Sequence, residues 1–140
     1  MDHIEKKFIF IQTVIFSTST KVNKIYMNRL QVTARLKIHE GKLNEFKKVA
    51  TQCLMVVKER DKNTRQYDWF FNEDYTECVV RELYVNSNAV FEHLANLSEL
   101  FPQMLQTADL FLEVYGDPTP QLKEALSNMN IKYYTFYQGF

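Results

Sequence analysis

Hydrophobic and polar residues alternate strictly near the start of the patterned part of the chain. Leu30, Val32, Ala34 and Leu36 are apolar, and the residues between them are polar or charged. A period of two sends successive side chains to opposite faces of a strand. The segment therefore predicts a β-strand with one buried face.

After a turn at Gly41 the spacing changes to that of a helix. Apolar residues then recur every three or four positions, with charged and polar residues between them, as on an amphipathic helix. The predicted helix runs to about Arg60. Its apolar positions are Leu43, Phe46, Val49, Ala50, Cys53, Leu54 and Val57.

Two strand-like segments follow, at 66–71 and 77–85. The first is rich in aromatic residues and the second carries apolar residues on both faces. Asn72, Glu73 and Asp74 between them favour a tight turn, so the pair predicts a hairpin. On the first strand Tyr67, Trp69 and Phe71 share one face, and Phe70 lies on the other.

The remaining elements are expected in the order helix, helix, strand, helix, strand. Ser87 is expected to cap the first of these helices through its hydroxyl. The others are a short helix from 99 to about 107, a strand at 111–115, a helix after the turn at 117–120, and a strand at 131–137.

The resulting order is β-α-β-β-α-β, followed by α-β. The first six elements predict an α+β fold of the ferredoxin-like split β-α-β type, an antiparallel sheet with helices on one face. Apolar residues on both strand faces favour a second copy covering the open face, and therefore a homodimer. We expect one domain at 29–115, with 116–140 as its C-terminal helix-strand extension.

The first 28 residues stand apart from this pattern. The apolar stretch from Phe8 to Phe16 is too short to span a membrane as a helix. Three interpretations remain: a signal peptide, an edge strand or arm, and a non-native extension upstream of a true start at Met27.

Charge and cysteine content narrow the function classes. Lys plus Arg and Asp plus Glu each number 17, so the balance gives no basic face for nucleic acid or an anionic membrane. The two cysteines, Cys53 and Cys78, are too few for a disulfide scaffold, and no cysteine–histidine cluster suggests a metal. We expect free thiols and a cytoplasmic location.

His93 and Glu82 are the candidates for acid–base chemistry. Imidazole titrates near neutrality, so His93 is the natural base, and Glu82 could hold its other ring nitrogen. Arg81 must face away from Glu82 because adjacent strand residues point to opposite faces. The alternative is a structural histidine bonded to a carboxylate inside the core.

An ordered set of residues gives a family resemblance. It comprises Leu30–Ile38, Glu40-Gly41-Lys42 opening a helix that contains Phe46, Tyr67 and Phe70, Arg81–Tyr84, and His93 eleven residues after Glu82. The set resembles the antibiotic biosynthesis monooxygenase family over residues 29–112, most closely from Val80 to Leu97.

The resemblance implies a homodimeric α+β barrel with a pocket in each subunit. It also implies oxidation of hydroquinone- or anthrone-like rings by O₂, with no metal or flavin cofactor. Such chemistry needs a base, an apolar pocket and donors for the anion. The implied catalytic residues are His93 and Glu82, and the implied substrate-binding residues are Tyr67, Trp69, Phe70 and Tyr84.

Two alternatives stay open. One is a non-catalytic dimeric module that binds a small apolar ligand or acts as a scaffold. The other is a haem-degrading monooxygenase, whose relatives place an Asn, a Trp and a His around the haem. Trp69 lies in the second strand instead of the third, and the first strand contains no Asn, which counts against haem.

Overall fold

The computed structural model describes residues 28–140 and follows the predicted order of elements. The elements are β1 (Leu30–Ile38), α2 (Leu43–Arg60), β2 (Thr64–Phe71), β3 (Glu77–Tyr84), α3 (Ser87–Asn96), α4 (Leu100–Thr107), β4 (Ala108–Tyr115), α5 (Pro120–Ala125) and β5 (Ile131–Tyr134). The predictions for the N-terminal arm, signal peptide and Met27 start lie outside the described residues.

The strands form one sheet in the order β2-β3-β1-β4-β5. The pairs β1–β3, β1–β4 and β2–β3 are antiparallel, which confirms the predicted split β-α-β arrangement. Strand β5 instead pairs parallel to β4. The reason is the helical crossover through α5, which returns the chain in the direction of the preceding strand.

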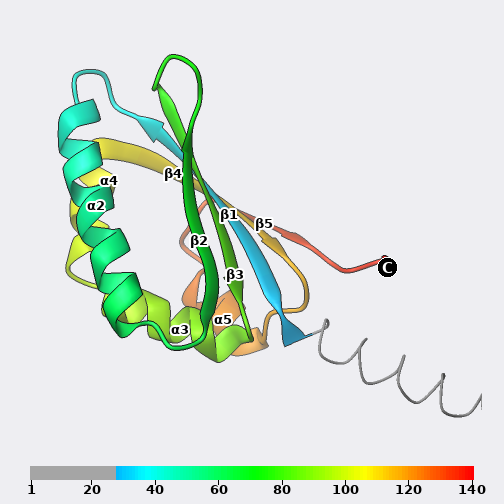
Figure 1. Ribbon diagram of the computed structural model, residues 1–140. Helices are drawn as coiled ribbons and strands as arrows, with labels where there is room; N and C mark the ends of the chain where they lie inside the picture. Colours follow the sequence, from blue (N-terminus) through cyan, green and yellow to red (C-terminus); the bar gives the residue numbers. More distant parts are fainter. Residues whose placement is uncertain (1–27) are drawn as a thin grey trace, which may run out of the picture.

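The helices cover one face of the sheet, and the core lies between the two layers (Figure 1). The alternating residues of β1 face the helices: Leu30, Val32, Ala34 and Leu36 are all buried. Phe46 on α2 is fully buried against the same sheet. The period of two therefore located the buried face of β1 correctly.

The cap of α3 is not the predicted one. Asn86, in extended backbone, accepts a hydrogen bond from the Ala89 N–H at 3.0 Å, whereas Ser87 is the first helical residue. The buried Ser87 hydroxyl accepts from the Thr119 N–H at 3.0 Å. Asn and Ser are about equally good caps, so residue type alone could not choose between these neighbours.

The face of the sheet away from the helices is partly apolar. Phe70, Val79, Arg35 and Phe111 lie in one row across β2, β3, β1 and β4. Phe70 is 55% exposed and Phe111 36%. None of the helices in residues 28–140 has the length and hydrophobicity of a membrane-spanning segment.

Candidate active site

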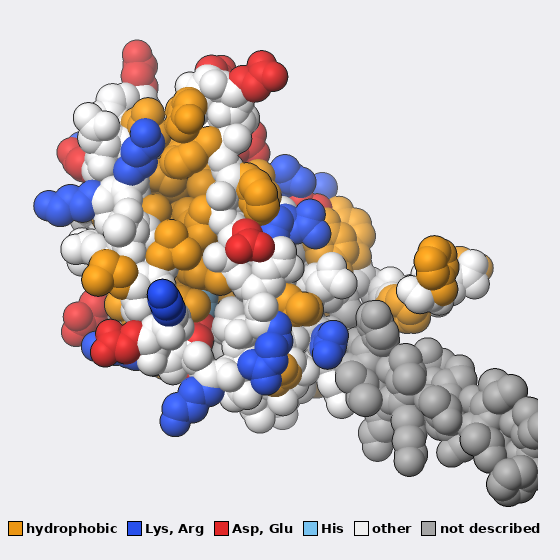
Figure 2. All heavy atoms as spheres, in the orientation of Figure 1, with side chains coloured by type: hydrophobic (Ala, Val, Ile, Leu, Met, Phe, Trp, Pro, Cys, Tyr) orange, Lys and Arg blue, Asp and Glu red, His pale blue; other side chains and the backbone are white. Residues whose placement is uncertain are grey.

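A largely apolar cavity lies between the sheet and the helical layer. The cavity has a volume of about 90 Å³, several times the roughly 10–15 Å³ that one bound water needs. Strands β1 to β4 and all four described helices contribute to its lining. Figure 2 shows apolar side chains visible in a hollow between α2 and β2, so the space beneath is close to the surface.

His93, from α3, brings an imidazole to this cavity. The residue is 5% exposed and is one of the few polar residues in the lining. Its Nδ1 lies 2.7 Å from Oδ2 of Asp61, at the end of α2. Because an ionised carboxylate can only accept, Nδ1 carries a proton, and in the neutral imidazole Nε2 therefore keeps its lone pair.

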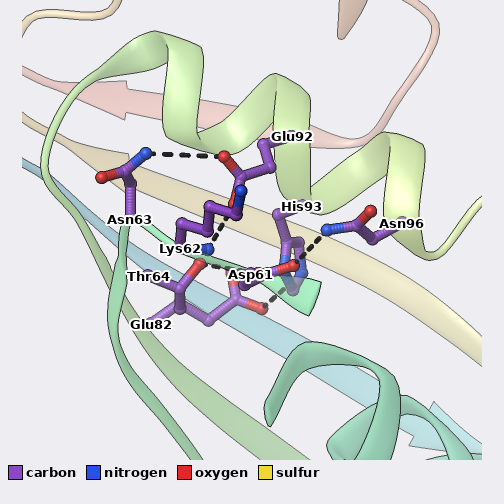
Figure 3. A network of polar contacts seen from close by, with 8 residues as sticks. All are labelled: Asp61, Lys62, Asn63, Thr64, Glu82, Glu92, His93 and Asn96. Atoms are coloured by element: carbon purple, nitrogen blue, oxygen red, sulfur yellow. Dashed lines mark hydrogen bonds and ion pairs between the residues drawn. The ribbon is translucent and has the colours of Figure 1, made fainter. Parts of the chain in front are cut away.

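Asp61 is the centre of the polar cluster around the histidine. Its side chain is 1% exposed and also accepts hydrogen bonds from Thr64 Oγ1 at 2.7 Å and Asn96 Nδ2 at 2.8 Å (Figure 3). Burial raises the pKa of Asp61, but the hydrogen bonds from His93, Asn96 and Thr64 outweigh it and lower the pKa overall. Asp61 therefore stays ionised and holds the imidazole in one orientation.

Glu82, on β3, lies on the opposite side of the imidazole. Its Oε1 is 3.9 Å from Nε2 of His93, and its side chain is 10% exposed. Burial raises the pKa of Glu82 to about 7, with a smaller opposing contribution from His93 and from the Tyr84 hydroxyl, which donates to the carboxylate. Near neutral pH Glu82 can thus either donate or accept a proton.

Two tyrosines hold the imidazole ring between them. Ring centroids of Tyr67 and Tyr84 lie 5.1 and 5.3 Å from that of His93, both in edge-on arrangements. Burial raises the pKa of both phenols, and the charge of the neighbouring Glu82 raises it further, so they remain protonated. The rings fix His93 from two sides and leave its nitrogen-bearing edges for Asp61 and Glu82.

Trp69 adds a hydrogen-bond donor without a partner. Its indole Nε1 is buried and makes no hydrogen bond, although the side chain lines the cavity. An unpaired buried N–H costs free energy, so such groups in native proteins call for an explanation. A ligand with an acceptor atom beside Trp69 would supply the missing bond.

The structure brings most of the predicted site residues together. His93, Glu82, Tyr67, Trp69 and Tyr84 all line the cavity.

Phe70 is not among them, because its side chain points to the opposite face of β2 and is 55% exposed. Arg81 is exposed on that same face, as the strand alternation required.

Asp61 was not identified from the sequence. It lies in a short polar connection that looked like an ordinary loop, 32 residues before the histidine it contacts. Only the packing of α3 against the start of β2 places the two together. A carboxylate directly after a long amphipathic helix was the available signal, and it is a weak one.

The described residues contain no group of three or more His, Cys, Asp or Glu side chains arranged to bind a metal ion. Cys53 and Cys78 are both buried free thiols, and burial raises the pKa of each to about 11. Neither thiol is therefore a nucleophile at neutral pH.

Comparisons with known proteins identify the architecture. No protein-family model matches the chain, and no curated protein does. Among solved structures, MupZ from Pseudomonas fluorescens aligns at 22% identity and a TM-score of 0.72, over 81% of this chain and 93% of MupZ. The chain has the same fold as MupZ.

Other structures with this fold carry functional descriptions. A proposed antibiotic biosynthesis monooxygenase from Caulobacter crescentus aligns at 22% identity and a TM-score of 0.60, over 69% of this chain and 96% of its own. SnoaB from Streptomyces nogalater, a cofactor-independent oxygenase, aligns at 12% identity and a TM-score of 0.57, over 66% of this chain and 95% of SnoaB. The predicted α+β fold of the ferredoxin-like type is thus confirmed.

Proposed function

We propose that the chain is a monooxygenase of the antibiotic biosynthesis type that oxidises a small aromatic or quinol-like compound without a bound cofactor. The observation that carries this proposal is the buried His93–Asp61 pair, whose free Nε2 lone pair lies at an apolar cavity. The descriptions of the Caulobacter protein and SnoaB support the reaction class.

The first step is removal of a proton from the substrate by Nε2 of His93. Phenols and anthrones react slowly with O₂ until they lose a proton, so a positioned base supplies much of the acceleration. The ionised Asp61 stabilises the imidazolium that forms, because its Oδ2 is 2.7 Å from Nδ1. Asp61 keeps its own charge throughout, since hydrogen bonds lower its pKa.

The second requirement is stabilisation of the substrate anion. Trp69 can donate its unpaired indole N–H, and Glu82 can donate in its protonated form, which its raised pKa of about 7 populates near neutrality. The anion then reacts with O₂: one oxygen atom enters the substrate and the other leaves as water. The substrate supplies the electrons, so no external reductant is needed.

The functional form in this proposal is a cytoplasmic homodimer. The row of Phe70, Val79 and Phe111 on the open face of the sheet supports sheet-to-sheet contact with a second copy. The two buried free thiols are consistent with a reducing compartment.

A second candidate function is a non-catalytic module that binds the same kind of small molecule. The observation that favours it is the packing of His93, which is 5% exposed, bonded to Asp61 and flanked by two tyrosines. Such a histidine could be purely structural. A measurement of turnover distinguishes the two candidates, because only the enzyme converts the molecule, whereas both would bind it.

The test is oxygen uptake by metal-stripped protein with a panel of hydroquinones and anthrones. His93→Gln is expected to lower kcat by about 10²–10⁴-fold, the usual contribution of a general base. His39→Gln is the matched control, because His39 pairs with Asp109 at 2.9 Å on the surface, away from the cavity lining. Equal turnover in the wild type and His93→Gln would remove His93 as the base; binding without turnover in any form would favour the non-catalytic module.

A further inference from the structure

We infer that the C-terminal extension, residues 116–140, sets the length of the ligand that the cavity admits, and that this ligand is neutral, elongated and apolar with one polar end. The inference rests on the proposed function only for the position of that polar end, beside His93. It assigns a specificity role to a segment outside the acid–base cluster.

The extension forms one end wall of the cavity. Leu122 and Leu126 are 1% and 4% exposed, and both line the cavity together with Met129. The Thr119 hydroxyl caps α5 by accepting from the Leu122 N–H at 3.2 Å, and the Thr119 N–H is itself bound by Ser87 of α3. The wall is thus fixed to the helix that carries His93.

The polar groups of the cavity come from one side. Tyr67, Trp69, Glu82 and Tyr84 belong to the neighbouring strands β2 and β3, and His93 packs against them.

Towards α5 the lining becomes aliphatic, with Leu30, Val32 and Val114 opposite Leu122 and Leu126. A ligand that satisfies both regions places a polar group beside His93 and an apolar tail under α5.

The charges of the site disfavour a ligand that enters the cavity already ionised as an anion. No Lys or Arg is among the residues that line the cavity, so a carboxylate or phosphate would be buried without a cation. The ionised Asp61 behind His93 adds repulsion. The cavity therefore selects neutral molecules.

The solved structures differ in how much of this chain they match. The Caulobacter protein uses 96% of its own length yet leaves 31% of this chain without a counterpart. MupZ, by contrast, matches 81% of this chain. A segment at the cavity wall can change ligand choice and leave the acid–base cluster unaltered.

The experiment is a binding titration followed by the fluorescence of Trp69, the only tryptophan in the chain and a cavity residue. The probes are 4-alkylphenols from methyl to octyl, with 4-alkylbenzoates as anionic counterparts; the protein is the full chain. Affinity should rise about fourfold per added methylene, the burial value for one CH₂, and then stop at a defined chain length. Benzoates should bind at least tenfold more weakly than phenols of equal length.

Leu126→Ala and Met129→Ala should move that limit to chains at least two carbons longer. Leu105→Ala is the control, because Leu105 is 41% exposed and does not line the cavity. Met129 is only partly buried, so Met129→Ala decides the question if Leu126→Ala does not fold.

An unchanged limit in Met129→Ala, equal binding of benzoates, or no binding of any phenol would overturn the inference. The titration measures binding and not turnover. Its result would therefore still hold if the protein proved not to be an oxygenase.

Discussion

Asp61 and Glu82 flank the same imidazole, yet the pKa of Asp61 is lowered and that of Glu82 is raised. Asp61 accepts three hydrogen bonds, which lower its pKa despite burial. At Glu82 the effect of burial is larger than the opposing effects of His93 and Tyr84, and the pKa rises to about 7. Two carboxylates with separated pKa values can take two roles, one as a fixed charge and one as a proton carrier.

The raised pKa of Glu82 predicts a pH-dependent stability. A carboxyl group whose folded-state pKa lies above its unfolded value favours the native state at low pH and loses that contribution as pH rises. Between about pH 4.5 and 7 the wild type should lose on the order of 3 kcal/mol that Glu82→Gln does not lose. Urea unfolding of both proteins at pH 5 and pH 8 measures the difference; parallel pH profiles would show that Glu82 titrates normally.

Removal of the Asp61 charge should destabilise the protein. Asp61→Asn places an amide N–H₂ among three donors and leaves some of them unpaired in a buried site, at a cost of about 2–4 kcal/mol in unfolding free energy.

Asp109→Asn is the control, because Asp109 also bonds a histidine but has a side chain that is 67% exposed; it should cost under about 1 kcal/mol. Thermal denaturation gives both values, and equal losses would argue against a special role for the buried pair.

At the residue scale the sequence predicted more of the residues that line the cavity than of the polar cluster around His93. Tyr67, Trp69 and Glu82 could be assigned to one face from strand alternation alone. Phe70 could be seen to face the other way, and its inclusion as a substrate-binding residue followed the family resemblance. Asp61 required a long-range contact that no local pattern encodes.

Among the elements, the junction between β4 and α5 depends on one glycine. Gly116 has φ of +126°, and a Cβ added there would lie 2.7 Å from the carbonyl oxygen of Arg29. The extension that closes the cavity therefore turns away from β4 at a position that only glycine occupies without strain.

Gly116→Ala should lower the unfolding free energy by about 2–4 kcal/mol, because both the backbone angle and the contact are unfavourable. Gly41→Ala should cost about 1 kcal/mol: its φ is +77°, but nothing lies within 4 Å of the added Cβ. Chemical denaturation of the two variants compares them directly. A smaller loss at Gly116 than at Gly41 would contradict the steric account.

Element types were predictable from periodicity, and their edges were not. Strand β4 begins at Ala108, three residues before the predicted start, because it pairs with β1 as far as Ile38. Strand β5 ends at Tyr134 instead of Tyr137, since its pairing with β4 stops at Tyr115. In both cases the neighbouring strand decides the boundary.

At the scale of the whole molecule, the open face of the sheet gives the oligomer prediction. Phe70 and Phe111 are exposed in one row with Val79 and with Arg35, which forms an ion pair with Glu113 at 2.6 Å. Exposed aromatic residues on a sheet face are typical of an interface.

Light scattering after size exclusion should give twice the chain mass of 16.7 kDa for the wild type. Phe70→Asp should shift the protein towards the monomer by burying a charge at the contact. Leu54→Asp, a 40% exposed position on α2, should leave the mass unchanged. A monomeric wild type at micromolar concentration would refute the dimer.

The claim on which the account depends is that Nε2 of His93 presents a free lone pair to a ligand in the cavity. Nitrogen-15 NMR of the histidine side chains, assigned with His93→Gln, tests it most directly. We predict a protonated Nδ1 and an unprotonated Nε2 for His93 in the free protein, and a shift of the Nε2 signal on addition of a 4-alkylphenol, with His39 unaffected. A protonated Nε2 in the free protein, or an Nε2 signal that saturating phenol leaves unchanged, would contradict the account.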